Sequence, residues 1–472
     1  MSIGACRSRM NRKRATIRGL AVDTHGLTVG MQLRRPTSPS AWSKAIRWLL
    51  LGLVALSCAY FLYRGPYRAW QHTIDLRTFY SASQAWLNGS NPYDTLNIGN
   101  VFRQAGGVID PAVSLNPPLT FVLMAPLAML PWPVAEAAWT ILNLLLVAVC
   151  IWMVMAVARV SIREPRGLLF LAFAIALAPF HTSISQGQLT IPVTALVVAS
   201  LWGQIHNRPV LSGICIALAV ALKPQMGLLF LPLLLFRRQW KALLCGMSAL
   251  AVITAVAVGR LAIAGVDWLP TLQSNLAHAT QGGIDDPTAA GAYLMINLQV
   301  LLHLLLPDQT QLTLDVVTYV AVAAAGAVLL LALRHRDDQE AQILLYAGCA
   351  VLTLLVVYNR IYSATLLILP LAWAFSPLRP PRSLAAATIV AAAIAVFLIP
   401  GAAALASLPL PPDLQSISDT LWWRHLLVHE VYALVIILVG LLLGARFRDA
   451  APVRLGSIEA GEVGVGNGFE RA

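Results

Sequence analysis

The chain has 472 residues, of which 58% are hydrophobic and only 11% charged, and its formal net charge is +12. A soluble globular protein needs about 25% charged residues to cover its surface, so this composition excludes that class. It indicates an all-α polytopic membrane protein, because helices satisfy their own backbone groups within a bilayer. The six cysteines fit neither a disulfide framework nor a metal-ligand spacing, and we predict no metal or cofactor site.

The first 47 residues contain ten Lys and Arg side chains and a single acidic residue, Asp23. A basic arm of this kind can bind nucleic acid. The positive-inside rule offers a simpler interpretation, a cytoplasmic tail before the first span, and we predict no nucleic-acid partner. We expect residues 1–45 to form a disordered cytoplasmic tail, residues 46–447 the transmembrane domain, and residues 448–472 a second cytoplasmic tail.

Apolar runs separated by basic loops predict about twelve transmembrane helices with both termini in the cytoplasm. The predicted spans are 46–63, 135–158, 167–180, 189–205, 209–222, 225–236, 242–264, 313–333, 341–357, 364–375, 383–400 and 428–446. The apolar runs 117–131 and 293–306 are shorter than the roughly 20 residues that a crossing needs. If 117–131 crossed, the basic loop that contains Arg159 would lie outside. We therefore predict short juxtamembrane helices at the outer face for both runs.

The segment Thr73–Asp94 follows the first predicted span and begins with an isolated carboxylate. Helical spacing predicts a helix over 74–87, with one face formed by Asp75, Phe79, Ala82 and Trp86. A single carboxylate can act as the base of a glycosyl transfer when phosphate is the leaving group, unlike the carboxylate pair of glycosidases. The alternative is structural: Asp75 pairs with Arg68 or Arg77, or is a solvated loop residue.

The same topology places six polar side chains from distant loops at the outer face: Asp75, Gln188, Lys223, Asn297, Asn359 and Arg360. Lys223 could contact a phosphate as a point charge and Arg360 as a two-pronged donor. Alternatively, both could be interfacial residues whose charges reach water. Asp285 and Asp286 occupy an outer loop, where we expect solvated carboxylates, although one could act as a second acid. The sequence contains no nucleotide-binding motif in a supporting context, which argues against a nucleotide-sugar donor.

Four short motifs recur in order between about residues 70 and 305. They are Asp75-x-x-x-Phe79-Tyr80-x-Ala82 with Leu87-x-Gly89-x-x-Pro92-Tyr93; Asn116-Pro117-Pro118-Leu119 with Pro126-Leu127 and Trp139; Gly187-Gln188 with Gly213 and Lys223-Pro224; and Asn297-x-Gln299. In this order and spacing the chain resembles glycosyltransferase family 87 of the GT-C superfamily. The resemblance implies a GT-C-like membrane hexosyltransferase, similar to α-mannosyltransferases, that takes its sugar from a polyprenyl phosphate.

The resemblance also implies a site and a location. Asp75 would be the general base of an inverting transfer to a glycan or glycolipid at the outer face of a bacterial inner membrane. The implied donor-phosphate ligands are Lys223 and Arg360, and the implied substrate-binding residues are Tyr80, Tyr93, Gln188, Asn297 and Asn359. Mannosyltransferases of the family resemble one another in a Ser-Trp-x-His-His stretch, whereas this chain reads Tyr358-Asn359-Arg360-Ile361-Tyr362, so mannose is not carried over. The alternatives are a transporter or lipid flippase, and a non-catalytic assembly subunit.

Overall fold

The computed structural model describes residues 41–69, 73–108, 113–281, 283, 285–289, 291–399, 401–408 and 420–446. The chain divides into two compact units, Met1–Ala45 and Ile46–Ala472, and the helical bundle belongs to the second. The predicted tails lie outside the described residues, except for residues 41–45. In the described part of the chain all regular structure is helical, apart from one antiparallel bridge between Met295 and Arg360.

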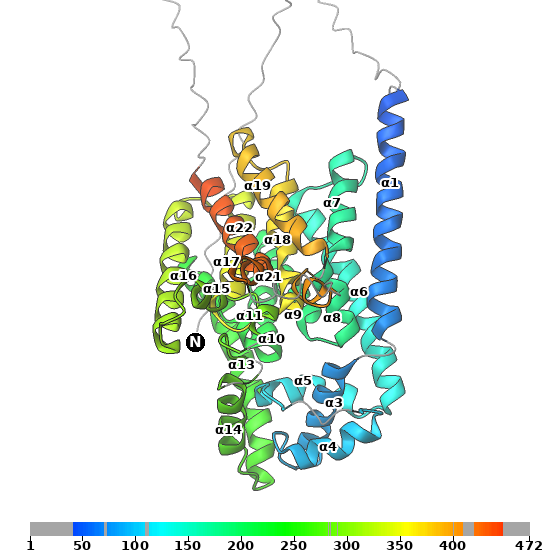
Figure 1. Ribbon diagram of the computed structural model, residues 1–472, viewed down its shortest axis with the longest axis vertical. Coiled ribbons are helices and arrows are strands. Elements are labelled where there is room, and N and C mark those ends of the chain that lie inside the picture. Colours follow the sequence, from blue (N-terminus) through cyan, green and yellow to red (C-terminus); the bar gives the residue numbers. More distant parts are fainter. Residues whose placement is uncertain are drawn as a thin grey trace, which may run out of the picture. The chain divides into compact units, whose positions relative to one another are not determined.

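The helices follow one another with short connections (Figure 1). In the first half they are α1 (Ala41–Leu62), η1 (Tyr63–Tyr67), α3 (Ile74–Leu87), α4 (Thr95–Gln104), α5 (Pro118–Ala128), α6 (Trp132–Ala158), α7 (Pro165–Ala176), α8 (Ala178–Gln186), α9 (Thr190–Ile205), α10 (Pro209–Leu222), α11 (Pro224–Gly227), α12 (Phe230–Phe236) and α13 (Trp240–Ile263). In the second half they are α14 (Leu269–Thr280), η2 (Ala292–Leu294), α15 (Leu298–Leu305), α16 (Gln311–Leu333), α17 (Gln339–Val356), η3 (Ile361–Leu367), α18 (Ile368–Phe375), η4 (Pro381–Ser383), α19 (Leu384–Ile394), η5 (Ala395–Leu398), α20 (Gly401–Ala406), α21 (Leu421–Leu427) and α22 (His429–Arg446).

Eight of the described helical segments are long and apolar enough to cross a membrane, which makes the chain a multi-pass membrane protein. They are Lys44–Tyr67, Trp132–Ala158, Pro165–Gln186, Trp240–Ile263, Gln311–Leu333, Gln339–Val356, Pro381–Leu398 and His429–Arg446. The other four predicted spans coincide with shorter apolar helices, so the count of twelve stays a prediction. Short helices also occur where 117–131 and 293–306 were predicted, and their place at a membrane surface stays a prediction.

Burial separates the inner helices of the bundle from the outer ones. In the most apolar window of α17, 78% of the residues are buried, whereas the corresponding figures for α13 and α1 are 17% and 11%. Helix α17 therefore lies at the centre, packed against α16, α18, α22 and η3, and α13 and α1 present apolar side chains outward, as lipid-facing helices do.

The contact between α10 and α13 depends on two glycines. A Cβ atom at Gly213 would lie 2.0 Å from the Ala242 carbonyl oxygen, and one at Gly246 would lie 2.8 Å from the Gly213 carbonyl oxygen. Small residues at such crossings let two helix backbones approach closely in a membrane. This close packing fixes the direction of α10, and Lys223 directly follows its last residue.

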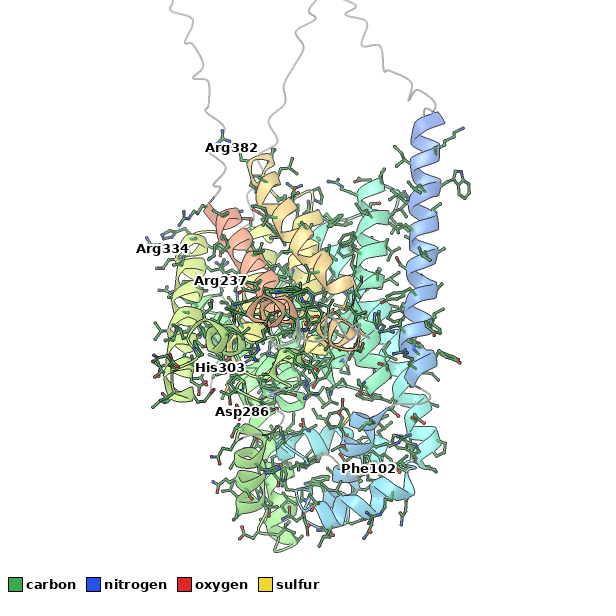
Figure 2. All side chains as sticks on the ribbon, viewed as in Figure 1. Phe102, Arg237, Asp286, His303, Arg334 and Arg382 are labelled. Atoms are coloured by element: carbon green, nitrogen blue, oxygen red, sulfur yellow. The ribbon has the colours of Figure 1, made fainter. Side chains whose placement is uncertain are left out.

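The two ends of the bundle differ in character. Helices α3, α4, α5 and α14 gather at one end, the lower end in Figure 1. Arg334 and Arg382 lie toward the other end, far from Phe102 of α4 (Figure 2). At that basic end the Arg237 guanidinium donates a hydrogen bond to the Arg336 carbonyl oxygen at 2.8 Å. The structure thus gathers basic loops at one end, as the charge pattern predicts.

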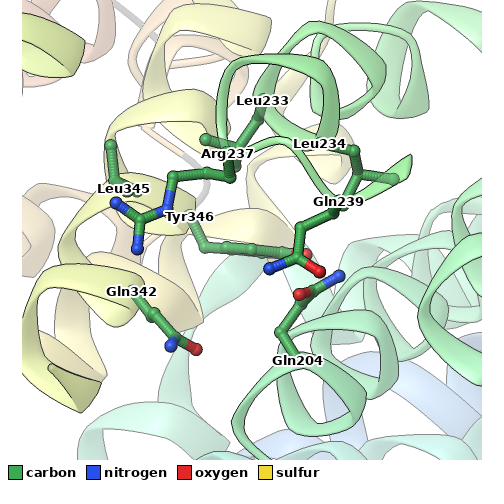
Figure 3. Close-up of a pocket in the computed structure, with 8 residues that line it drawn as sticks. All are labelled: Gln204, Leu233, Leu234, Arg237, Gln239, Gln342, Leu345 and Tyr346. Carbon is green, nitrogen blue, oxygen red and sulfur yellow. The ribbon is translucent and has the colours of Figure 1, made fainter. Parts of the chain in front are cut away.

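A small polar cavity lies at the basic end, between α9, α12 and α17. Its volume is about 30 Å³, enough for one or two water molecules, and Arg237, Tyr346 and three glutamines line it (Figure 3). One of these glutamines, Gln204, lies near the C-terminal end of α9, whereas Gln188 precedes its N-terminus. Sixteen helical residues span about 24 Å, so this cavity is remote from Gln188.

Candidate active site

Asp75 lies in the first turn of α3, where the exposed backbone N–H groups of a helix favour a carboxylate. The predicted helix over 74–87 is confirmed at both ends. Asp75 Oδ2 accepts a hydrogen bond from Gln188 Nε2 at 2.6 Å, although the two residues are 113 positions apart. Arg77, one of the cations considered as its partner, instead lies over the Trp132 ring, 5.3 Å from the ring centroid.

The main chain brings Gln188 to Asp75 through a sharp turn. The residues between the predicted spans 167–180 and 189–205 are mostly helical, since His181 to Gln186 belong to the buried helix α8. The helix ends at Gly187, which has a positive φ of 71°. A Cβ atom there would lie only 2.5 Å from Leu76 Cβ, so the turn packs directly against the start of α3.

Lys223 continues the series of side-chain hydrogen bonds that begins at Asp75 and Gln188. Its Nζ lies 3.4 Å from Gln188 Oε1 and 3.5 Å from Ser363 Oγ, and it lies over the Tyr362 ring at 4.6 Å from the centroid. Lys223 ends α10 because the following Pro224 disfavours helical backbone at the residue before it. With only 6% of its surface exposed, Lys223 is a buried cation at a helix break.

Arg360 and Asn359 come from the extended segment after α17, and Asn297 from the start of α15. Main-chain contacts join the two segments: Met295 bridges to Arg360, and the Ile296 N–H donates to the Asn359 carbonyl oxygen at 2.8 Å. Asn297 Oδ1, Asn359 Oδ1 and Arg360 Nε are buried and have no hydrogen-bond partner among the residues that the structure describes. Buried polar atoms normally have partners, so these atoms are available to a ligand.

Burial and charge act together on the titratable groups of this cluster. Desolvation raises the pKa of Asp75 above its ordinary value, although the Gln188 hydrogen bond and the charges of Lys223 and Arg360 act in the opposite direction. Desolvation lowers the pKa of Lys223 to about 7, against the attraction of Asp75. Shifts of this kind, in a buried cluster of opposite charges, are typical of functional sites.

Asp285 joins the cluster, although the sequence favoured a solvated carboxylate. Its carboxylate lies in the field of Arg360, and Tyr358 and Lys223 also favour its ionised form. Burial raises the pKa of Asp285 to about 6. The position of Asp285 in the sequence does not predict these interactions. Only its place in a predicted outer loop suggested that it could act as a second acid.

Tyr80 and Tyr93 make other contacts. The Tyr80 hydroxyl donates to the Leu130 carbonyl oxygen at 2.7 Å, and the Tyr93 hydroxyl donates to the Asn116 carbonyl oxygen at 2.8 Å. These bonds tie the short helices α3, α4 and α5 together. The structure does not bring either hydroxyl to the Asp75 cluster, and their sugar-binding role stays a prediction.

Gly187→Ala should separate Asp75 from Gln188. A left-handed conformation costs a non-glycine residue about 1–2 kcal/mol, and the added methyl group would push against Leu76. We expect a lower unfolding temperature and a fall in any activity that depends on the cluster of at least about tenfold. Gly89→Ala is a matched control, because Gly89 also has a positive φ but lies at the far end of α3. Equal activity losses in both variants would contradict the prediction.

Comparison with known proteins places the sequence of this chain in a family. The sequence model of Glycosyltransferase family 87 matches residues 115–357, about half of the chain. The chain belongs to glycosyltransferase family 87. The matched residues of this family 87 chain contain Gln188, Lys223, Asp285 and Asn297, whereas Asp75 and Arg360 lie outside them.

Two curated relatives resemble parts of this family 87 chain. An alpha-(1->3)-arabinofuranosyltransferase of Corynebacterium glutamicum is 25% identical over 187 residues, which are 39% of this chain and 42% of the relative. A polyprenol-phosphate-mannose-dependent alpha-(1-2)-phosphatidylinositol mannoside mannosyltransferase of Mycolicibacterium smegmatis is 27% identical over 292 residues, 57% of this chain and 62% of the relative. The chain thus matches less than two thirds of either relative's length.

Proposed function

We propose that this chain is a membrane hexosyltransferase that moves a sugar from a polyprenyl-phosphate donor to a glycan or glycolipid. The acceptor would lie at the outer face of a bacterial inner membrane, with both chain termini in the cytoplasm. The family and the name of the mannosyltransferase relative support this proposal. The observation that carries it is the buried chain of contacts from Asp75 through Gln188 to Lys223.

The proposed reaction is a single displacement. The Asp75 carboxylate takes the proton of the acceptor hydroxyl, and the acceptor oxygen forms a bond to the anomeric carbon of the donor sugar. The bond between that carbon and the phosphate oxygen breaks, and its electron pair stays on the phosphate. Asp75 suits the role of base because its pKa is raised toward the working pH by burial.

Lys223 and Arg360 would stabilise the leaving group. The departing polyprenyl phosphate carries one more negative charge than the phosphodiester of the donor, and preorganised cations stabilise charge that develops in a transition state. Lys223 offers a compact charge, and Arg360 an Nε without a partner in the chain. The unpartnered oxygens of Asn297 and Asn359 could accept hydrogen bonds from sugar hydroxyls.

Membranes that contain the full chain test the donor class. We expect label from a radiolabelled polyprenyl-phosphate hexose to enter a glycan or glycolipid fraction, and no label to enter it from the matching nucleotide sugar when polyprenyl-phosphate synthesis is blocked. Gluco-, galacto-, manno- and arabino-configured donors should be compared, because the sugar is open. Transfer from the nucleotide sugar alone would overturn the proposal, and movement of intact donor across the membrane without transfer would favour the transporter alternative.

A further inference from the structure

A second cavity opens beside the Asp75 cluster, on the other side of a short helix. Its volume is about 580 Å³, in the range of small-molecule sites. Helices α15, α20 and α21 and the residues 287–289 and 292–293 form its walls. The residues that give it chemical character are Thr288, Tyr293, His303, Trp423 and Arg424.

The lining of this groove suits a carbohydrate better than a lipid chain. Aromatic rings such as Tyr293 and Trp423 can stack on the apolar face of a sugar ring, while the hydroxyl groups of the sugar need polar partners. His303 Nδ1 is buried and has no partner within the described part of the chain, and Arg424 adds further donors at the wall. An acyl chain would leave these polar groups without partners, which costs free energy. By contrast, the groove lined by Cys58, Trp152 and Ile175 is almost wholly apolar.

Neighbouring parts of the chain contribute to the groove wall and to the candidate active site. One segment begins at Asp285, which faces Arg360, and continues as the groove wall from Pro287. In Figure 2, Asp286 and His303 lie at neighbouring levels of the molecule.

Helix α15 presents a different face to each side. Gln299 bonds the Asn297 side chain and the Val356 carbonyl oxygen, toward the cluster, whereas Val300 and His303 line the groove. A chain-like ligand in the groove could therefore extend one end toward Asp75.

We propose that this groove binds the acceptor glycan, holding the sugar units next to the one whose hydroxyl reacts. The identification of the ligand as the acceptor rests on the proposed function. Carbohydrate binding by the groove, however, can be measured without catalysis. The groove is thus the specificity site for the acceptor, and the cluster of Asp75, Lys223 and Arg360 handles the donor.

The test uses the full chain in nanodiscs, prepared without sugar detergents, and a panel of neutral mono-, di- and trisaccharides as probes in saturation-transfer NMR. We expect at least one oligosaccharide to give a signal that Trp423→Ala and His303→Ala remove. Trp422→Ala is the matched control, because Trp422 is the exposed neighbour on the same helix, and it should keep the signal. Asp75→Asn should keep it as well, since Asp75 does not line the groove.

A transfer assay completes the test. With an alkyl disaccharide acceptor, the two groove variants should raise the acceptor KM about tenfold or more, as loss of one stacking or polar contact does, while the donor KM changes less than twofold. Thermal unfolding in nanodiscs identifies any variant that fails to fold. If His303→Ala fails to fold, His303→Gln replaces it. No saccharide signal with the wild type, or a signal that the groove variants retain, overturns the proposal. A groove-dependent signal without any transfer from polyprenyl-phosphate sugars would instead count against the proposed function alone.

Discussion

Asp75→Asn should lower the transfer rate by about 10²- to 10⁴-fold, the usual contribution of a general base. Asparagine has the same shape and can still accept the hydrogen bond from Gln188 Nε2, so the fold and the donor KM should change little. What it cannot do is take the proton of the acceptor hydroxyl. The measurement is single-turnover transfer from a radiolabelled polyprenyl-phosphate sugar in membranes, at equal amounts of wild-type and variant protein.

Two controls separate catalysis from folding in this experiment. Asp267→Asn changes an exposed carboxylate near α14 and should leave the rate at the wild-type level. Asp75→Glu moves the carboxylate by one methylene and should retain more activity than Asp75→Asn. If Asp75→Asn, correctly folded, transferred sugar at a near-wild-type rate, Asp75 would not be the base, and Asp285 would be the next carboxylate to test.

Lys223→Met should reduce kcat/KM by about 10²- to 10³-fold, the cost of removing one preorganised charge donor. The pH profile should change as well. In the wild type, the acid limb follows Asp75, which must be ionised, and the alkaline limb begins near pH 7, where Lys223 loses its proton. Because the Lys223 charge lowers the pKa of Asp75, its loss should move the acid limb to higher pH and abolish the alkaline limb.

Lys223→Arg tests the same assignment with the charge kept. Arginine stays protonated far above pH 7, so this variant should lose the alkaline limb near pH 7 while the acid limb stays in place. Its activity should exceed that of Lys223→Met, although a planar guanidinium fits the helix break less well. The kcat/KM profile is the one to record, because it reports on the free enzyme. An alkaline limb near pH 7 that survives in both variants would contradict the role of Lys223.

The charge pattern and the lengths of the apolar runs predicted which side chains lie on the same face, but not which atoms contact one another. The helix over 74–87 was correct at both ends because its apolar spacing is a local signal, and Gly89, which has a positive φ, follows its last turn. The positive-inside rule assigned Asp75, Gln188 and Lys223 to one face, and the structure joins them by hydrogen bonds. The rule gives a side of the membrane and no distance, so the direct bond from Gln188 to Asp75 could not be anticipated.

Contacts made by Tyr80, Tyr93 and Asp285 could not be read from the sequence, and the sugar-binding role of the two tyrosines stays a prediction. Tyr80 and Tyr93 resembled sugar-binding residues, yet their hydroxyls bond carbonyl oxygens of Leu130 and Asn116, and a carbonyl partner leaves no mark in a sequence. Asp285 appeared to be a solvated loop carboxylate because the groups that act on it, Arg360 and Tyr358, are more than 70 positions away along the chain. Long-range packing, rather than local pattern, decided all three.

Gln188 also limits where protons can travel. The ionised Asp75 carboxylate can only accept hydrogen bonds, and the charged Lys223 ammonium can only donate them. The Gln188 amide between them therefore has one allowed orientation, with Nε2 toward Asp75 and Oε1 toward Lys223. An amide neither gains nor loses protons at working pH, and it therefore blocks proton transfer between the two groups while their charges still attract each other. A proton taken up by Asp75 cannot pass to Lys223 through Gln188. A proton that Asp75 takes up in the proposed reaction therefore has to leave by a route that does not pass through Gln188.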